Sequence, residues 1–127
     1  MGLTELENLL QQACDNVNEG EQDIQGINRF PAILYWPFIL ASANASGETY
    51  HYVATYQVSL LDKFPPRRSP TLRNLDALLR QFKGISGEWR MEYSAEEKIW
   101  HSAISIDIEV DENEFFALGE HGENIGN

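Results

Sequence analysis

The sequence predicts an α+β domain, in which a mixed, mainly antiparallel β-sheet has two helices packed on one face. Three observations predict this class: a long alternating stretch at 50–61, an amphipathic stretch that begins at Ser69, and two further alternating stretches at 88–93 and 99–110. A chain of 127 residues suits one hydrophobic core. We therefore expect a single domain over residues 1–110, followed by an acidic C-terminal tail at 111–127 that we expect to be flexible.

The first helix is expected from about Glu5 to Asn18. Thr4 and Glu7 have the spacing of a capping box, in which each side chain pairs with a backbone N–H at the start of the helix. Gly20 supplies a plausible end for the helix. The apolar stripe at helical spacing consists of Leu6, Leu9, Leu10, Ala13 and Val17.

The segment 30–41 is strongly apolar but contains Pro31 and Pro37. Proline has no N–H to donate to a sheet, so we expect at most two short strands here, or one kinked strand at a sheet edge. Small residues at 42–47 then favour a turn.

The clearest strand covers Tyr50 to Leu61, and its length would let it project beyond the body of the sheet. The segment that follows, 62–68, contains two consecutive prolines and predicts an exposed loop. The residues that share the more apolar face of the strand are Tyr50, Tyr52, Ala54, Tyr56, Val58 and Leu60.

The second helix begins at Ser69 and Pro70, which match an N-cap and a first helical position, and it is expected to end near Gly84. The last two stretches then form an antiparallel hairpin with its turn at 94–97. Trp89 and Trp100 are expected to face each other across this hairpin, either in the core or in a subunit interface. The helix stripe consists of Leu72, Leu75, Leu78, Leu79 and Phe82.

Charge is distributed unevenly along the chain, whose net charge is −11. Thirteen of the 20 acidic residues lie within residues 1–23 and 107–127, which contain no Lys or Arg, whereas six of the nine basic residues lie between Lys63 and Lys83. Acidic ends repel a phosphate backbone, so we expect no sequence-specific nucleic-acid partner. The longest mostly apolar stretch is too short to span a bilayer, so we expect no membrane partner.

No catalytic or metal-binding pattern is evident in the sequence. His51, His101 and His121 lie on separate predicted elements, and His51 and His101 are expected at the surface. Acidic neighbours disfavour a thiolate at Cys14, the single cysteine. We therefore expect neither an enzyme nor a cofactor or metal site.

Basic residues on and after the proline-rich loop are the best candidates for a contact surface, because a stiff loop loses little entropy when it docks. They could bind an acidic partner, including the acidic ends of a neighbouring copy, or they could serve only to keep the loop solvated. The candidate protein-contact residues, with two tyrosines of the long strand included, are Tyr50, Tyr52, Lys63, Phe64, Arg67, Arg68 and Arg73.

The order of elements resembles the tail-terminator and head–tail joining proteins of bacteriophages, often called minor capsid proteins. The stretches that resemble this family are 50–60 (YHYVATYQVSL), 70–79 (PTLRNLDALL) and 97–106 (EKIWHSAISI), within a match to residues 1–110. The resemblance implies a structural protein that forms a ring, commonly a hexamer, which caps the tail tube and contacts the tail tube protein and the head connector protein. It also implies a virion component that is assembled in the bacterial cytoplasm, with the strand 50–61 and the loop 62–69 as assembly surfaces.

Two other classes of protein fit the same sequence. Small acidic secretion chaperones form two-fold dimers and bind extended segments of their partners, and the number of subunits distinguishes them from a ring. A small binding or catalytic domain with a pocket lined by Tyr50, Tyr52 and Tyr56 is the third interpretation.

Overall fold

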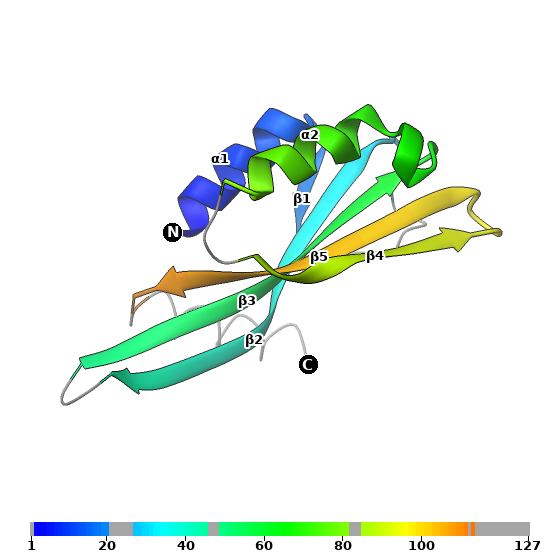
Figure 1. The fold of residues 1–127 in the computed structure, drawn as a ribbon. Coiled ribbons are helices and arrows are strands. Elements are labelled where there is room, and N and C mark those ends of the chain that lie inside the picture. The colour runs from blue at the N-terminus through cyan, green and yellow to red at the C-terminus, as the bar shows by residue number, and fades with distance from the viewer. Residues whose placement is uncertain (1, 21–26, 46–48, 82–84, 112, 114–127) are drawn as a thin grey trace.

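Two helices cover one face of a five-stranded sheet in the computed structural model, which describes residues 2–20, 27–45, 49–81, 85–111 and 113. Of residues 39–45, 49–51 and 85–87 it describes the backbone alone. The elements are α1 (Leu3–Ala13), β1 (Val17–Glu19), β2 (Ala32–Ala45), β3 (Thr49–Asp62), the 3₁₀ helix η2 (Pro66–Arg68), α2 (Pro70–Leu79), β4 (Ile85–Ser94) and β5 (Ile99–Val110). The strand order is β1-β2-β3-β5-β4, with β1 parallel to β2 and every other pair antiparallel. The predicted α+β class, with a mainly antiparallel sheet and two helices on one face, is confirmed (Figure 1).

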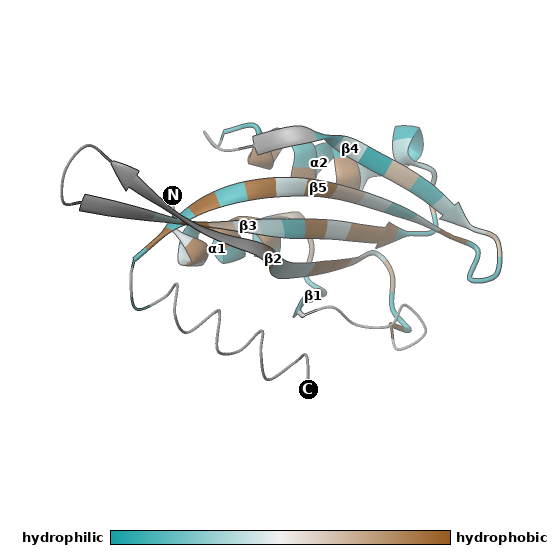
Figure 2. Cartoon of the chain, turned by 90° about the horizontal axis from the view of Figure 1, so that it is seen from below, coloured by the Kyte–Doolittle hydropathy of each residue, from teal (hydrophilic) through white to brown (hydrophobic). Residues whose placement is uncertain are grey.

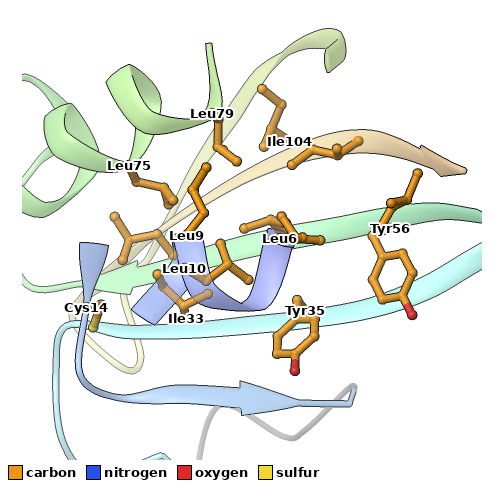
Figure 3. Close-up of a cluster of buried hydrophobic side chains, with 14 of the residues drawn as sticks. Leu6, Leu9, Leu10, Cys14, Ile33, Tyr35, Tyr56, Leu75, Leu79 and Ile104 are labelled. Carbon is orange, nitrogen blue, oxygen red and sulfur yellow. The ribbon is translucent and has the colours of Figure 1, made fainter. Parts of the chain in front are cut away.

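The main core lies between the helices and the sheet. Leucines of α1 and α2 point toward the strands in Figure 3 and meet Ile33, Tyr56 and Ile104 there. On β3 the predicted alternation is confirmed, since Ala54, Tyr56, Val58 and Leu60 are all buried beneath the helix layer. The helices thus bury the apolar face that the pattern of the sequence assigned to this strand.

A smaller cluster lies on the opposite face of the sheet. It joins Leu34 of β2, Leu61 of β3 and Ile99 of β5, with Phe30 and Trp36 packed against it. Figure 2 shows β5 alternating between hydrophobic and hydrophilic residues along its length, as expected for a strand with one buried face.

The first helix is shorter than the sequence predicts. It ends at Ala13, because Cys14 is extended and the chain then pairs with β2, where the N–H of Ile33 donates to the carbonyl of Asn16 at 2.8 Å. Val17, predicted on the helix stripe, therefore begins β1. The capping box is also wrong: Gly2 is the N-cap, and no side chain caps the helix.

Of the two alternatives for the segment 30–41, two short strands is wrong, because Ala32–Ala45 forms one strand. Among the described residues β1 pairs with β2 only from Ile33 to Tyr35, so at Pro37 β2 has β3 alone as its neighbour, which agrees with one kinked strand at a sheet edge. Pro37 is accommodated because the register with β3 shifts between Pro37 and Ile39, and such an irregularity leaves a residue without a ladder hydrogen bond. Together β2 and β3 extend away from the helices as a two-stranded ribbon (Figure 1).

The second helix and the final hairpin follow the prediction closely. The hydroxyl oxygen of Ser69 accepts a hydrogen bond from the N–H of Leu72 at 3.0 Å, which is the predicted N-cap, and Pro70 is the first helical residue. The helix ends at Leu79, while the predicted end at Gly84 lies outside the described residues. The turn between β4 and β5 falls at residues 95–98, one residue later than the predicted 94–97.

Candidate functional site

The loop between β3 and α2 is held at both ends by a buried carboxylate. Asp62 is the last residue of β3 and is almost fully buried. Its two carboxylate oxygens accept hydrogen bonds from the N–H of Phe64, at 3.2 Å, and from the hydroxyl of Ser69. The same Ser69 hydroxyl oxygen caps α2, so one connected network joins the strand, the loop and the helix. This network fixes the path of residues 63–68, which we call the arginine loop.

Within the arginine loop the backbone is equally constrained. Pro65 and Pro66 fix two φ angles, and the N–H of Arg68 donates to the carbonyl of Pro65 at 2.8 Å to form η2. A loop in one conformation before binding loses less entropy when a partner binds. The sequence therefore builds a preorganised surface here.

The side chains of the arginine loop point to solvent. Lys63, Arg67 and Arg68 are exposed, as is Arg73 in the first turns of α2, and Phe64 is 58% exposed. The Lys63 ammonium lies 5.9 Å from the centre of the Phe30 ring. Within the described part of the chain, one ion pair is present, between Arg80 and Asp76. Lys63, Arg67, Arg68 and Arg73 therefore form no ion pair with a described carboxylate.

An apolar groove of about 560 Å³ lies beside the arginine loop. Its lining residues are Pro65, Pro66, Arg67, Met91 and Trp100. The Tyr93 ring packs against Trp100 with 5.1 Å between ring centres, which extends the aromatic surface along the hairpin. Met91 and Tyr93 are each about half exposed, at 48% and 47%. The arrangement offers an open apolar surface with one arginine, Arg67, in its lining.

The predicted pairing of Trp89 with Trp100 is wrong. The register places Tyr93 opposite Trp100, and an irregularity between Ser86 and Arg90 displaces Trp89 from the regular ladder. Trp89 instead packs against the main core and donates from its indole nitrogen to the Asp76 carboxylate at 2.9 Å. The alternation in the sequence predicted that Met91 and Tyr93 share one face of a strand. It did not predict that the arginine loop lies beside them.

The two predicted tyrosines lie far from the arginine loop. Tyr52 pairs with Val110, whereas Asp62 pairs with Trp100, so the two groups of candidates occupy opposite ends of β3. Tyr52 is half-buried against the main core. The backbone of Tyr50 pairs with Asn44, and its side chain lies outside the described residues. The structure thus brings together Lys63, Phe64, Arg67 and Arg68, with Arg73 on the adjoining helix.

Titratable groups with shifted pKa values stand apart from the groove and from one another. Burial raises the pKa of Tyr35, and the carboxylate of Glu7, to which its hydroxyl donates, raises it further. Burial likewise raises the pKa of Cys14, and the charge of Asp15 adds to that effect, which agrees with the expectation of an unreactive thiol. Burial raises the pKa of Asp76, but the hydrogen bonds from Trp89 and Arg80 outweigh it and lower the pKa overall.

His101 departs from the prediction of a surface histidine. It is half-buried on the sheet face opposite the helices, where Leu61 and Glu92 are its cross-strand neighbours. Burial lowers its pKa, and the charge of Glu92 partly opposes this. Within the described part of the chain no group of three or more histidine, cysteine or carboxylate side chains could hold a metal ion. None of the helices described is long and apolar enough to cross a membrane.

Comparison with known proteins gives a distant likeness among solved structures. No family model and no curated protein matches this chain. Among solved structures, the chain is similar to a chain in the virion of a native gene transfer agent (GTA) particle, with 12% sequence identity, a TM-score of 0.48 and 83% of each chain covered. At that identity and TM-score the likeness assigns neither a family nor a function to this chain.

Proposed function

We propose that this chain is a structural virion protein of the bacteriophage type, which assembles into a ring that caps the tail tube and joins it to the head. The observation that carries this proposal is the end of the sheet at which the arginine loop lies beside an open apolar groove. We call this part of the molecule the docking end. The family resemblance of the sequence supplies the ring and the partners, namely further copies of this chain, a tail tube protein and a head connector protein. The virion chain to which the fold is distantly similar agrees with this setting, and the proposal does not depend on it.

The composition of the docking end suits a protein partner. Aromatic residues, methionine and arginine are enriched at protein interfaces, and all three kinds line or border this groove. An Arg side chain covers apolar surface with its stem and presents its charge at the rim. Because Asp62 and Ser69 hold the loop in place, the surface needs little reorganisation on binding.

Charge favours a partner that is itself acidic. The four exposed cations of this end have no carboxylate partner among the described residues, and the whole chain carries a net charge of −11. The cations of one copy can therefore meet the acidic regions of another, which gives both orientation and specificity. Such contacts between unlike surfaces generate rings, whereas contacts between like surfaces generate two-fold dimers.

Light scattering on a sizing column, across a concentration series, tests the proposal. We expect a hexamer, or a monomer that becomes a hexamer as the concentration rises. Met91→Glu should reduce the assembled mass, because it places a charge in the groove. Phe38→Glu is the matched control, since Phe38 is exposed to the same degree, at 47%, but lies on β2 and outside the groove lining.

A tight dimer at every concentration would contradict the ring and favour the dimeric, secretion-chaperone-like alternative. Equal loss of mass in the Met91 and Phe38 variants would show that the groove has no special part in assembly. Retention of the full mass in both variants would lead to the same conclusion.

A further inference from the structure

The groove and the C-terminal tail have complementary chemistry. The tail has the sequence DENEFFALGEHGE over residues 111–123, with five acidic residues and no Lys or Arg around the apolar island Phe115–Leu118. The groove is lined by Met91, Trp100 and two prolines together with Arg67, and Arg68 follows Arg67 in the arginine loop. An apolar island flanked by acids matches an apolar groove that has an arginine in its lining.

We propose that residues 111–123 of one copy dock in the groove of a neighbouring copy, with Phe115–Leu118 against Met91 and Trp100 and the flanking acids against the arginine loop. The inference rests on the proposed ring and names the contact between its subunits.

The length of the tail shows why the groove must belong to a neighbour. Trp100 lines the groove at the start of β5, and the tail leaves β5 after Val110, ten residues further along the strand. Ten residues of strand span about 33 Å. Five residues from Val110 to Phe115, even fully extended, reach at most about 18 Å. The aromatic residues of the tail therefore fall short of the groove of their own chain.

Docking of this kind joins two different surfaces, the tail of one copy and the groove of the next. Each copy contributes its tail to one neighbour and its groove to another, so the contact repeats around a closed ring or along an open filament. The relation also explains why cations gather at one end of β5 and acids follow its other end.

A peptide of residues 111–123 with a fluorescent label provides the direct test, by fluorescence anisotropy. The receptor is the full chain with Phe115→Ser and Phe116→Ser, so that its own tail does not compete. We expect saturable binding that weakens about tenfold or more when the same two substitutions are made in the peptide. Arg67→Glu with Arg68→Glu in the receptor should weaken binding by a similar factor, and added salt should weaken it further. Phe38→Glu in the receptor should leave it unchanged.

Mixing two defective chains tests the direction of the contact. The chain with Arg67→Glu and Arg68→Glu keeps its tail, and the chain with Phe115→Ser and Phe116→Ser keeps its groove. Each alone should remain a monomer, and the mixture should form a one-to-one heterodimer and nothing larger, because a single intact contact remains.

The outcomes separate this inference from the proposed ring. If the natural chain assembles and the Phe115 and Phe116 variant assembles equally well, the ring stands and the tail contact is wrong. If the natural chain forms open filaments while the peptide binds the groove, the contact stands and the ring is wrong. If the natural chain remains a monomer at every concentration, the tail contact between copies is wrong together with the ring. A peptide that does not bind, or that binds the Arg67 and Arg68 variant equally well, overturns the inference, and an unrelated acidic peptide that binds as tightly assigns the groove to another partner.

Discussion

The two ends of the sheet face beneath the helices differ in how far their side chains are buried. Toward one end Leu6, Leu10, Leu75 and Leu79 are completely buried between the helices and the strands. Toward the other, Met91 and Tyr93 belong to the same kind of alternating strand, yet about half of each side chain is exposed. The difference lies in what covers them, since α2 begins only after the arginine loop and leaves the end of the hairpin open. The covered end contributes to stability, and the open end leaves an apolar surface exposed, where we propose that a partner binds.

Leu75→Ala should cause the largest loss of stability, because it removes a completely buried side chain from the covered end. We expect the free energy of unfolding to fall by about 2–5 kcal/mol. Met91→Ala at the open end should change it by less than about 1 kcal/mol, because that side chain already contacts water. Urea denaturation followed by circular dichroism measures both, and similar losses would contradict the contrast between the two ends.

Asp62→Ala should cause the next largest loss of stability, because Asp62 links the end of β3 to the arginine loop and to the start of α2. The substitution removes the acceptor for the N–H of Phe64 and for the hydroxyl of Ser69, which lies in a buried position. We expect a loss of about 1–3 kcal/mol, together with weaker binding of the tail peptide as the arginine loop loosens. Asp107→Ala is the control, since Asp107 accepts a hydrogen bond from Thr55 on an exposed site and its loss should cost less than about 0.5 kcal/mol. An Asp62 variant that keeps full peptide affinity would show that the network does not position the loop.

Local signals in the sequence predicted the elements on both sides of this network. The Ser69–Pro70 pair marked the start of α2, and strict alternation identified the buried face of β3, because each of these signals depends on residues close in sequence. The candidate loop residues Lys63, Phe64, Arg67 and Arg68 were also identifiable, since proline and charge together predict exposure.

Tertiary contacts decided what the sequence could not predict. Helix propensity favoured a continuation through Val17, but pairing with β2 makes that residue part of β1. Pro37 argued against a continuous strand, but β2 continues through it with a register shift, at a position beyond the pairing with β1. The groove depends on the register of the hairpin and on the position of the arginine loop beside Met91. Neither can be predicted from residues that are close in sequence.

Trp89→Phe should have a moderate effect, which distinguishes the two tryptophans of the hairpin. The phenyl ring keeps most of the packing against the core but cannot donate to Asp76, so we expect a loss of about 1 kcal/mol. Trp100→Phe should leave stability nearly unchanged and weaken binding of the tail peptide, because Trp100 lines the groove. Urea denaturation and fluorescence anisotropy measure the two effects separately. A Trp89 variant that binds the peptide less tightly than the Trp100 variant would contradict the assignment of roles.

The smallest expected effect lies on the opposite face of the sheet and appears as a dependence of stability on pH. Burial lowers the pKa of His101 below its ordinary value of 6.5, and Glu92 partly opposes this. The unfolded chain therefore binds a proton at this histidine more readily than the folded chain does, so stability falls as the pH drops below about 6.5 and stops falling once the folded histidine is also protonated. His101→Gln should remove this contribution from the curve of unfolding free energy against pH, measured by urea denaturation. Glu92→Gln should deepen the fall, because it removes the charge that favours the protonated form. Stability that instead rises as the pH drops below about 6.5, and that Glu92→Gln makes independent of pH, would mean that the Glu92 charge outweighs burial at this histidine.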